Sequence, residues 1–338
     1  MTISRELAEF ATGYGAGSFA VGRNRIINGA MEIDQRNAGA SVTPNNTYTL
    51  DRWLYENTQT SKVTIQQNAG SVTPPAGFTN YLGVTSTSAY SVLTGDTFLI
   101  TQRIEGYNVA DLAWGTANAQ TITLSFWARS SLTGTFGGSL GNVNASRSYP
   151  FSYTIASANT WEYKTVTVAG DTSGTWNTGN GRGLSITFGL GSGSTYSGTA
   201  GAWASANLVQ PTGSVPVVGT NGATLYITGV QLEEGTVATP FERRQYGQEL
   251  ALCQRYFQRL TASGRYYTSD GNWGLQYPFK VTMRANPTYT NIGGGNNSLP
   301  GTNQGIISGS TQEAGIQWTG SVGTYYAYAL GATFNAEL

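Results

Sequence analysis

The sequence predicts an all-β protein built around two packed antiparallel sheets. Short runs rich in aromatic and β-branched residues recur along the chain and are separated by Gly, Asn and Ser. Several of these runs alternate apolar and polar residues, as in Thr121–Trp127 and Glu162–Val168, which is typical of strands with one buried face. Aromatic residues make up 12 % of the chain, and this argues for a folded core although charged residues are only 11 %.

Roughly ten such runs lie between residues 26 and 232, which is enough for two sheets packed face to face. The expected strands are Ile26–Ile33, Tyr48–Tyr55, Lys62–Gln67, Tyr90–Leu93, Thr97–Ile104, Thr121–Ala128, Phe151–Ile155, Trp161–Val168, Leu184–Leu190 and Ala223–Leu232. Gly, at 45 of 338 residues, and small polar residues supply the turns between them. The sequence therefore predicts a β-sandwich over residues 26–240, which can bury a sizeable core without disulfides.

The periodicity changes between residues 241 and 264. Apolar residues fall at Tyr246, Leu250, Cys253, Phe257 and Leu260, spaced four, three, four and three. This spacing places them on one stripe of an amphipathic helix, and Gly264 lies where the helix should stop. Cys253 is expected to be a small buried hydrophobe, because the chain has no His that could activate a thiol. We expect the helix to link two β regions.

Residues 265–338 return to strand patterns and predict a small C-terminal β region. The expected strands are Arg265–Thr268, Trp273–Tyr277, Phe279–Met283, Thr288–Asn291, Ile316–Trp318 and Tyr325–Leu330. Residues 291–305 are rich in Gly and Asn and are expected to form a loop. Because a region of this length can bury only a small apolar core by itself, we expect it to pack against the sandwich or against a second copy of itself.

Residues 1–25 form a leader that is too short and too Gly-rich to fold alone. Ser4 can cap a short helix, which the glycines from Gly13 onward end. Two interpretations remain open: a flexible end, or a docking arm that becomes ordered on a partner chain. The expected organisation is thus a docking arm (1–25), the β-sandwich (26–240), a linking helix (241–264) and a C-terminal β domain (265–338).

Neither a secretory signal nor a membrane span is expected. The first ten residues, MTISRELAEF, lack the apolar segment of a signal peptide. No apolar run approaches the roughly 18 residues that a membrane-spanning helix needs. We therefore expect a soluble protein made in the cytoplasm, with no membrane partner.

Charge and composition exclude several function classes. The chain has 18 basic and 18 acidic residues, and this neutral balance does not suit binding to nucleic acid phosphates. The absence of His removes the commonest acid–base group and the commonest metal ligand, and a single Cys leaves no disulfide or zinc framework. No nucleotide-binding or nucleophile motif is present. We expect no catalytic residues, no metal and no cofactor.

One enzymatic alternative remains open, a glycoside hydrolase that uses two carboxylates. The candidate acids are Asp34, Asp51, Asp96, Glu105, Asp111, Glu162, Asp171, Glu233 and Glu234. Glu233 and Glu234 are neighbours at the end of an expected strand, so their side chains should point to opposite faces. A facing pair can still be formed by folding.

Four aromatic residues are candidates for binding a sugar. Trp114, Trp176, Tyr196 and Trp203 lie in segments rich in Gly, Ser, Thr and Asn rather than in alternating strands. Sugar sites stack an aromatic ring on a pyranose face and surround it with neutral polar groups. The alternative is that these rings anchor loops on the sheet. Three other tryptophans occur in strand patterns and are expected in the core: Trp53, Trp127 and Trp161.

Three stretches resemble a family of phage tail-fibre-like proteins. They are residues 24–37 (NRIINGAMEIDQRN) followed by 51–53 (DRW), residues 229–242 with 253–257 (GVQLEEG, TPFE and CQRYF), and residues 334–338 (FNAEL). A weaker likeness lies at residues 283–288 (MRANPT). The motifs occur in the order found in the family and bracket most of the chain.

The central part also resembles jelly-roll carbohydrate-binding modules. The likeness lies in an opening Asn28-Gly29-Ala30-Met31-Glu32 and a closing Ile227-Thr228-Gly229-Val230-Gln231-Leu232. Thr228 and Gly229 stand where such modules commonly have aspartates that help to hold calcium, and calcium needs several oxygen ligands. The resemblance thus implies a jelly-roll sandwich but does not support a metal.

Together the resemblances imply a virion protein: a tail-fibre or receptor-binding subunit, non-enzymatic, with possible weak binding of a host surface glycan. The charge-poor surface and the thin C-terminal region predict a homo-oligomer, and the resemblance implies that it is a trimer. Residues 1–25 are expected to dock onto other tail or baseplate proteins. Two alternatives are a tail polysaccharide depolymerase and a ligand-free connector or capsid decoration protein. Because the net charge is zero, we expect the glycan to be neutral.

Overall fold

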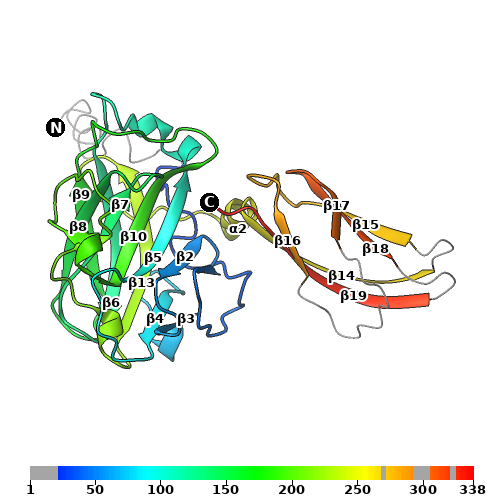
Figure 1. Ribbon diagram of the computed structural model, residues 1–338, viewed down its shortest axis with the longest axis horizontal. Helices are drawn as coiled ribbons and strands as arrows, with labels where there is room; N and C mark the ends of the chain where they lie inside the picture. The colour runs from blue at the N-terminus through cyan, green and yellow to red at the C-terminus, as the bar shows by residue number, and fades with distance from the viewer. Residues whose placement is uncertain (1–21, 268–271, 292–304, 320–324) are drawn as a thin grey trace, which may run out of the picture. The chain divides into compact units, whose positions relative to one another are not determined.

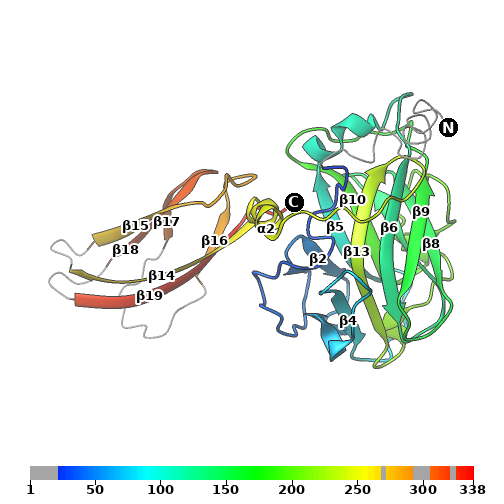
Figure 2. The same ribbon diagram turned by 180° about the vertical axis from the view of Figure 1, so that it is seen from behind.

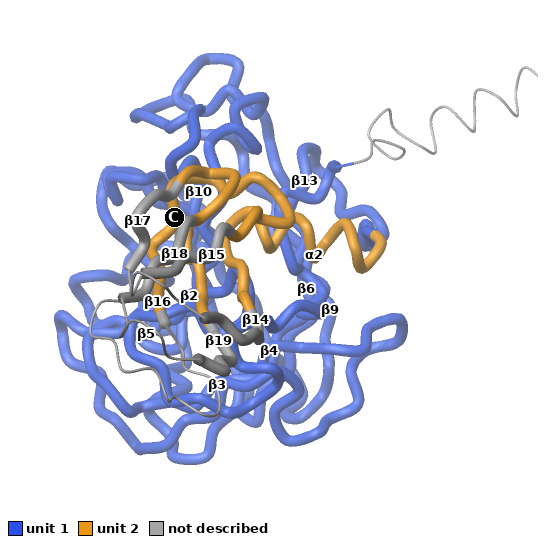
Figure 3. Tube along the Cα trace, turned by 90° about the vertical axis from the view of Figure 1, so that its right-hand side faces the viewer, with its two compact units in different colours: residues 1–244, 338 blue, residues 245–337 orange. Residues whose placement is uncertain are grey.

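The structure is a computed structural model that describes residues 22–267, 272–291, 305–319 and 325–338. The chain divides into two compact units, unit 1 (residues 1–244 with 338) and unit 2 (residues 245–337), which Figure 3 colours separately. The described elements are four antiparallel sheets, one short parallel pair of β11 (Ser197–Gly198) and β12 (Gln210–Pro211), short 3₁₀ turns and the helix α2, so the expected all-β class is confirmed. No helix in the described ranges has the length and hydropathy needed to cross a membrane.

Unit 1 is a sandwich of two antiparallel sheets, which confirms the jelly-roll prediction. In spatial order the first sheet contains β1 (Thr47–Leu50), β2 (Trp53–Asn57), β5 (Thr97–Glu105), β10 (Arg182–Ser192), β7 (Gly134–Gly141) and β8 (Ser148–Ile155). The second contains β3 (Val63–Gln67), β4 (Leu82–Ser86), β13 (Thr224–Glu234), β6 (Ile122–Ser130) and β9 (Glu162–Val168). Figures 1 and 2 show the two layers from opposite sides.

Strand alternation decides which side chains fill the space between the sheets. On β10, Ile186 and Phe188 are fully buried in the core, while Ser185 and Thr187 lie on the outer face of the six-stranded sheet. Trp53 is also fully buried in this core, as expected, and its indole N–H donates to the carbonyl oxygen of Asn28 at 3.0 Å. The outer face of the six-stranded sheet thus carries small polar groups above a dense apolar layer.

Several expected strands differ in the structure. Residues 26–33 form no strand, because Asn28 and Met31 adopt positive φ angles of 58° and 59°. The expected strand Tyr48–Tyr55 is divided into β1 and β2 by a turn in which Arg52 has a φ of 70°. Residues 90–93 are irregular, whereas β4 and the Gly-rich β7 were not expected.

A polar network, called the clasp below, ties residues 22–26 to residues 231–244. Its side chains are those of Asn24, Gln231, Glu242 and Arg244. The Glu242 carboxylate accepts hydrogen bonds from the backbone N–H groups of Gly22 and Asn24, at 2.7 and 2.6 Å. Gln231 accepts from the Glu242 N–H at 2.7 Å, and Arg244 donates to the backbone carbonyls of Asn24 and Ile26.

The clasp corrects the expected boundary of the leader. Asn24 is 3 % exposed, and its side-chain oxygen accepts from the backbone N–H groups of Ile26 and Leu232 at 3.0 and 3.1 Å. Arg25 forms an ion pair with Asp111. Residues 22–25 are therefore part of unit 1, and the expected docking arm is left with residues 1–21, which lie outside the described residues. Asn24, Gln231 and Glu242, which supply most of the clasp, thus have a structural role in unit 1.

Unit 2 contains α2 (Tyr246–Gln254) and two three-stranded sheets. The first sheet has the order β14 (Phe257–Tyr267), β19 (Tyr325–Asn335) and β16 (Thr288–Asn291). The second has the order β15 (Asn272–Pro278), β18 (Glu313–Thr319) and β17 (Gly305–Gly309). Its small core includes Met283, Phe334 and Phe279, and the ring of Tyr277 stacks on that of Phe334 at 5.5 Å.

The expected helix over residues 241–264 is shorter in the structure. Phe257 and Leu260 lie on β14, and Tyr246 is 61 % exposed, so the apolar stripe is not a continuous buried face. Cys253 is fully buried, as expected. Residues 279–283 form no strand, and most of the loop expected at residues 291–305 lies outside the described residues. That α2 links the two units as a packing element stays a prediction.

The buried carboxyl of Asp51 should make the free energy of unfolding depend on pH in an unusual way. Burial raises the pKa of this carboxyl to about 6, although Arg36 and two hydrogen bonds from Gln35 act in the opposite direction. The folded state therefore binds the proton more tightly than the unfolded chain, whose pKa is about 3.9. The resulting stabilisation is complete below that value and is lost as the pH rises through 6.

As the pH falls from 7 to 5, we expect protonation of Asp51 to raise the free energy of unfolding by about 1 kcal/mol. Asp51→Asn keeps the shape of the side chain but removes its titration. Urea unfolding of both proteins at a series of pH values measures this, because subtracting the two profiles cancels the other carboxyls. Parallel profiles would contradict the expectation.

Candidate functional site

Three of the four aromatic residues predicted to bind a sugar come together at one end of the sandwich. The ring centroid of Trp114 lies 4.8 Å from that of Trp176 and 5.3 Å from that of Trp203, and the last two are 5.5 Å apart. All three pairs meet edge to face. Tyr149 adds a fourth ring, 5.3 Å from Trp203. Tyr196 lies on a separate 3₁₀ turn, Ser194–Tyr196, and does not join this cluster.

The surroundings of the tryptophans are those of loop anchors. The indole N–H groups of Trp114, Trp176 and Trp203 donate to the backbone carbonyls of Gln120, Ser173 and Ala169, at 2.8, 3.1 and 2.8 Å. Trp114 is only 7 % exposed, and the space beside it holds about 10 Å³. The rings therefore pack on one another and leave no room for a sugar ring between them. Glycan contact through Trp114, Trp176, Trp203 and Tyr196 stays a prediction.

Two other tryptophans depart from expectation. Trp127 and Trp161 are half-buried and lie outside the main core. The ring centroid of Trp127 lies 5.3 Å from that of Tyr163 on β9, and the ring centroid of Trp161 lies 5.5 Å from that of Tyr81. Both were expected to be interior because they occur in alternating runs, but alternation does not say which of the two faces is the inner one.

An ion pair connects the tryptophan loops to the outer face of the six-stranded sheet. Arg147 donates to both carboxylate oxygens of Asp171, from Nε and from Nη2, each at 2.7 Å. Asp171 is 2 % exposed, and this bond raises the pKa of Arg147 despite partial burial. The same guanidinium donates to the Ser205 hydroxyl at 2.7 Å. Arg147 therefore joins three loops and also borders the groove described next.

A polar groove lies on the outer face of the six-stranded sheet, over β2, β5, β10 and β7, with residues 207–209 along one side. Its volume is about 70 Å³. The residues that line it are Glu56, Leu99, Thr101, Ser139, Gly141, Asn142, Ala145, Arg147, Ser148, Arg182, Ser185, Thr187, Asn207, Leu208 and Val209. Hydroxyl and amide groups predominate, and no aromatic side chain is among them. The groove is therefore suited to hydrogen bonding rather than to ring stacking.

One hydroxyl in the groove, that of Ser185, is available for a hydrogen bond with a ligand. The hydroxyl of Ser185 is buried and has no hydrogen-bond partner within the described residues. On the same strand the hydroxyl of Thr187 lies 3.3 Å from that of Thr101. A buried hydroxyl without a partner costs about 1–3 kcal/mol, so a ligand hydroxyl or a water at this point would be stabilised. Ser185 thus indicates where a polar ligand can bind.

The acids of the hydrolase alternative are not paired across the groove. The carboxylate in the lining is that of Glu56, and it forms an ion pair with Arg103 at 2.8 Å. Glu233 accepts hydrogen bonds from the N–H and hydroxyl of Thr239 and is 2 % exposed. A two-carboxylate mechanism needs a second acid facing the first, and the lining offers none. In the described part of the chain, no group of three or more metal-ligating side chains occurs.

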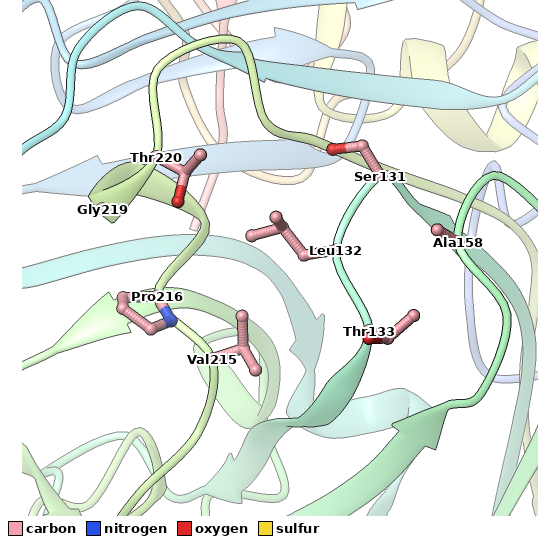
Figure 4. A pocket seen from close by; sticks show the side chains of 8 residues that line it. All are labelled: Ser131, Leu132, Thr133, Ala158, Val215, Pro216, Gly219 and Thr220. Carbon is pink, nitrogen blue, oxygen red and sulfur yellow. The ribbon is translucent and has the colours of Figure 1, made fainter.

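A larger hollow lies at the other end of the sandwich, among the loops that follow β6 and β8 and precede β13. It measures about 430 Å³ and is lined by Ser131, Leu132, Thr133, Ala158, Val215, Pro216, Gly219 and Thr220 (Figure 4). Its side chains are small and uncharged, and the hydroxyl of Ser131 already accepts the N–H of Thr224 at 2.9 Å. The hollow offers volume but few groups that would orient a ligand, so the groove is the better candidate.

Sequence reasoning missed the groove because its residues come from separate strands. Ser185 and Thr187 alternate with buried apolar residues on β10, and Thr101 does the same on β5. This alternation was visible, but only the pairing of β5 with β10 places Thr101 opposite Thr187. The available signal was that the strand at residues 184–190 carries hydroxyls, rather than charges, on its polar face.

No protein-family model and no curated protein matches the sequence. Among solved structures the chain is similar to a family 4 carbohydrate-binding module (15 % identity, TM-score 0.32), covering 62 % of this chain and 98 % of that one. It is also similar to a family 61 module in complex with β-1,4-galactotriose (11 %, TM-score 0.30, 63 % and 99 %). A third is a family 11 module of a Clostridium thermocellum cellulase (14 %, TM-score 0.28, 60 % and 99 %). These structural neighbours are carbohydrate-binding modules of jelly-roll fold, and the likeness concerns the fold alone.

Proposed function

We propose that the protein is a non-enzymatic, glycan-binding structural subunit of a phage tail, either a fibre or a receptor-binding component. The observation that carries the glycan part is the groove on the outer face of the six-stranded sheet. It presents hydroxyls, amides and a few charges on a rigid β-scaffold, and the Ser185 hydroxyl within it lacks a partner in the described chain. Sugar hydroxyls supply the complementary donors and acceptors.

A weak site of this kind gains strength from repetition. Each sugar–protein hydrogen bond largely replaces one with water, so affinity per groove should be modest. In a homotrimer, which the tail-fibre likeness implies, several grooves can engage one surface and raise the avidity by roughly 10²–10⁴ where the geometry permits. The trimer number and the place in the virion after synthesis in the host cytoplasm rest on that likeness, whereas self-association follows from the charge-poor surface and docking from the character of the leader.

A glycan array probed with the full-length protein tests the proposal. We expect binding to at least one bacterial surface polysaccharide and a loss of about tenfold or more in Asn207→Trp, because Asn207 is exposed at the rim and a large ring there would obstruct the groove. The matched control is Asn118→Trp, because Asn118 is also exposed and is not among the residues that line the groove. Equal binding by both variants would remove the groove as the site. Absence of binding throughout would leave the ligand-free connector.

A further inference from the structure

We infer that the groove prefers glycans that carry a carboxylate over neutral glycans, and that Arg182 is the residue that selects them. The inference rests on the proposed function and deepens it, since it names the class of sugar. It also departs from the neutral glycan expected from the net charge of the chain, because the local charge balance of the groove differs from the overall one.

The arginines around the groove differ in how they are paired. Glu56 is paired with Arg103, which also donates to the backbone carbonyl of Leu338. Arg147 is paired with Asp171 through two hydrogen bonds. Arg182 remains: its guanidinium donates to the carbonyl oxygen of Val143, and no ion pair joins it to a carboxylate of the described chain. Arg182 therefore has no direct ion pair in the described chain, and Glu56, which is bonded to Arg103, attracts it only at longer range.

The position of Arg182 makes this charge available to a ligand. It is the first residue of β10, it lines the groove, and it is half-buried. Burial is the main reason that the pKa of Arg182 is lowered, and the nearby Arg103 acts in the same direction. A desolvated guanidinium beside a second cation is stabilised by an anion, and a carboxylate can accept two of its N–H groups at once.

The size of the groove and the orphan hydroxyl agree with this ligand. A space of about 70 Å³ admits a group of a few heavy atoms rather than a whole buried ring. A carboxylate on the edge of a sugar fits that description. Ser185 lies three residues along β10 from Arg182, and its unpartnered hydroxyl can donate to a ring substituent or to the carboxylate itself. The rest of the sugar would lie along the rim formed by residues 207–209.

The test compares matched ligands on the full-length protein. The probes are uronate-containing oligosaccharides, each paired with its counterpart in which the carboxyl has been reduced to a primary alcohol. We expect the acidic member of a binding pair to bind about tenfold or more tightly at low salt, and the preference to shrink as salt rises. Arg182→Gln should abolish the preference by weakening the binding of the acidic member about tenfold or more. Arg129→Gln, which removes the same charge from the other sheet, should leave the preference intact.

The outcomes separate the inference from the proposed function. Equal binding of acidic and reduced members, or a preference that survives in Arg182→Gln, overturns the inference and leaves glycan binding in place. No binding of any pair overturns both. If Arg182→Gln fails to fold, the wild-type comparison of acidic and reduced members still decides the preference, and Arg182→Lys, which keeps the charge, should retain part of it.

Discussion

Replacing Trp114 by alanine is expected to lower the free energy of unfolding by about 3–5 kcal/mol. The side chain is 7 % exposed, and its ring is in contact with Trp176 and Trp203, so the change opens a cavity under two loops. The loss is a large part of the roughly 5–15 kcal/mol that stabilises a typical domain. Urea unfolding monitored by circular dichroism measures it.

Tyr163→Ala is the matched control for the tryptophan. Tyr163 is an aromatic residue on the edge strand β9, it contacts Trp127 at 5.3 Å, and it is 43 % exposed. Its removal should cost about 1 kcal/mol or less. If both variants lose the same stability, or if Trp114→Ala loses almost none, the tryptophan cluster is not the anchor inferred from its geometry, and its rings are available for a ligand.

Asn24→Ala is the second change with a large expected effect, a loss of at least about 3 kcal/mol. The Asn24 side chain accepts from the N–H groups of Ile26 and Leu232 and donates to the carbonyl oxygen of Val230 at 3.3 Å. Each buried backbone group left without a partner costs about 1–3 kcal/mol. Thermal and urea unfolding of the full-length chain measure the loss.

Asn118→Ala provides the control, because Asn118 is an exposed residue of a loop and should tolerate the change within about 0.5 kcal/mol. A stable Asn24→Ala variant would show that the clasp contributes little. Residues 22–25 would then belong with the leader, as the sequence first suggested.

The alternation of apolar residues was sufficient to predict the sandwich, because apolar residues recur at every second position of strands such as β6 and β10. It located β6, β9 and β10 closely. It failed where conformation depends on side chain–backbone contacts. Residues 26–33 look like a strand by composition, but Asn28 occupies a left-handed conformation and bonds the backbone groups of Ile33 and Asp51 instead.

The failures at β7 and α2 have other physical causes. β7 is Gly-rich because it lies against its neighbour: a Cβ on Gly138 would be 1.9 Å from the carbonyl oxygen of Thr187. Composition makes such a segment look like a loop. At α2 the four–three spacing continued by chance into β14, where Phe257 and Leu260 are buried by strand packing. The spacing of apolar residues alone could not show where the helix ends and β14 begins.

The aromatic site predicted from the sequence and the groove differ both in chemistry and in place. Loop aromatics were the natural candidates, and three of them do cluster, but they satisfy their own indole N–H groups. The groove depends on strands that are far apart in sequence, such as β2 and β7, and no local pattern identifies it. The charge left on Arg182 is visible only after each ion pair around the groove is known.

The clasp has a mechanical consequence for the sandwich. Glu242 and Arg244 hold backbone groups of residues 22, 24 and 26, so the two points where the chain passes into and out of the sandwich are fastened to each other. A force applied between residues 22 and 244 acts first on these hydrogen bonds of Glu242 and Arg244. The force bypasses the strands, and the groove above β5 and β10 keeps its shape until the fastening breaks.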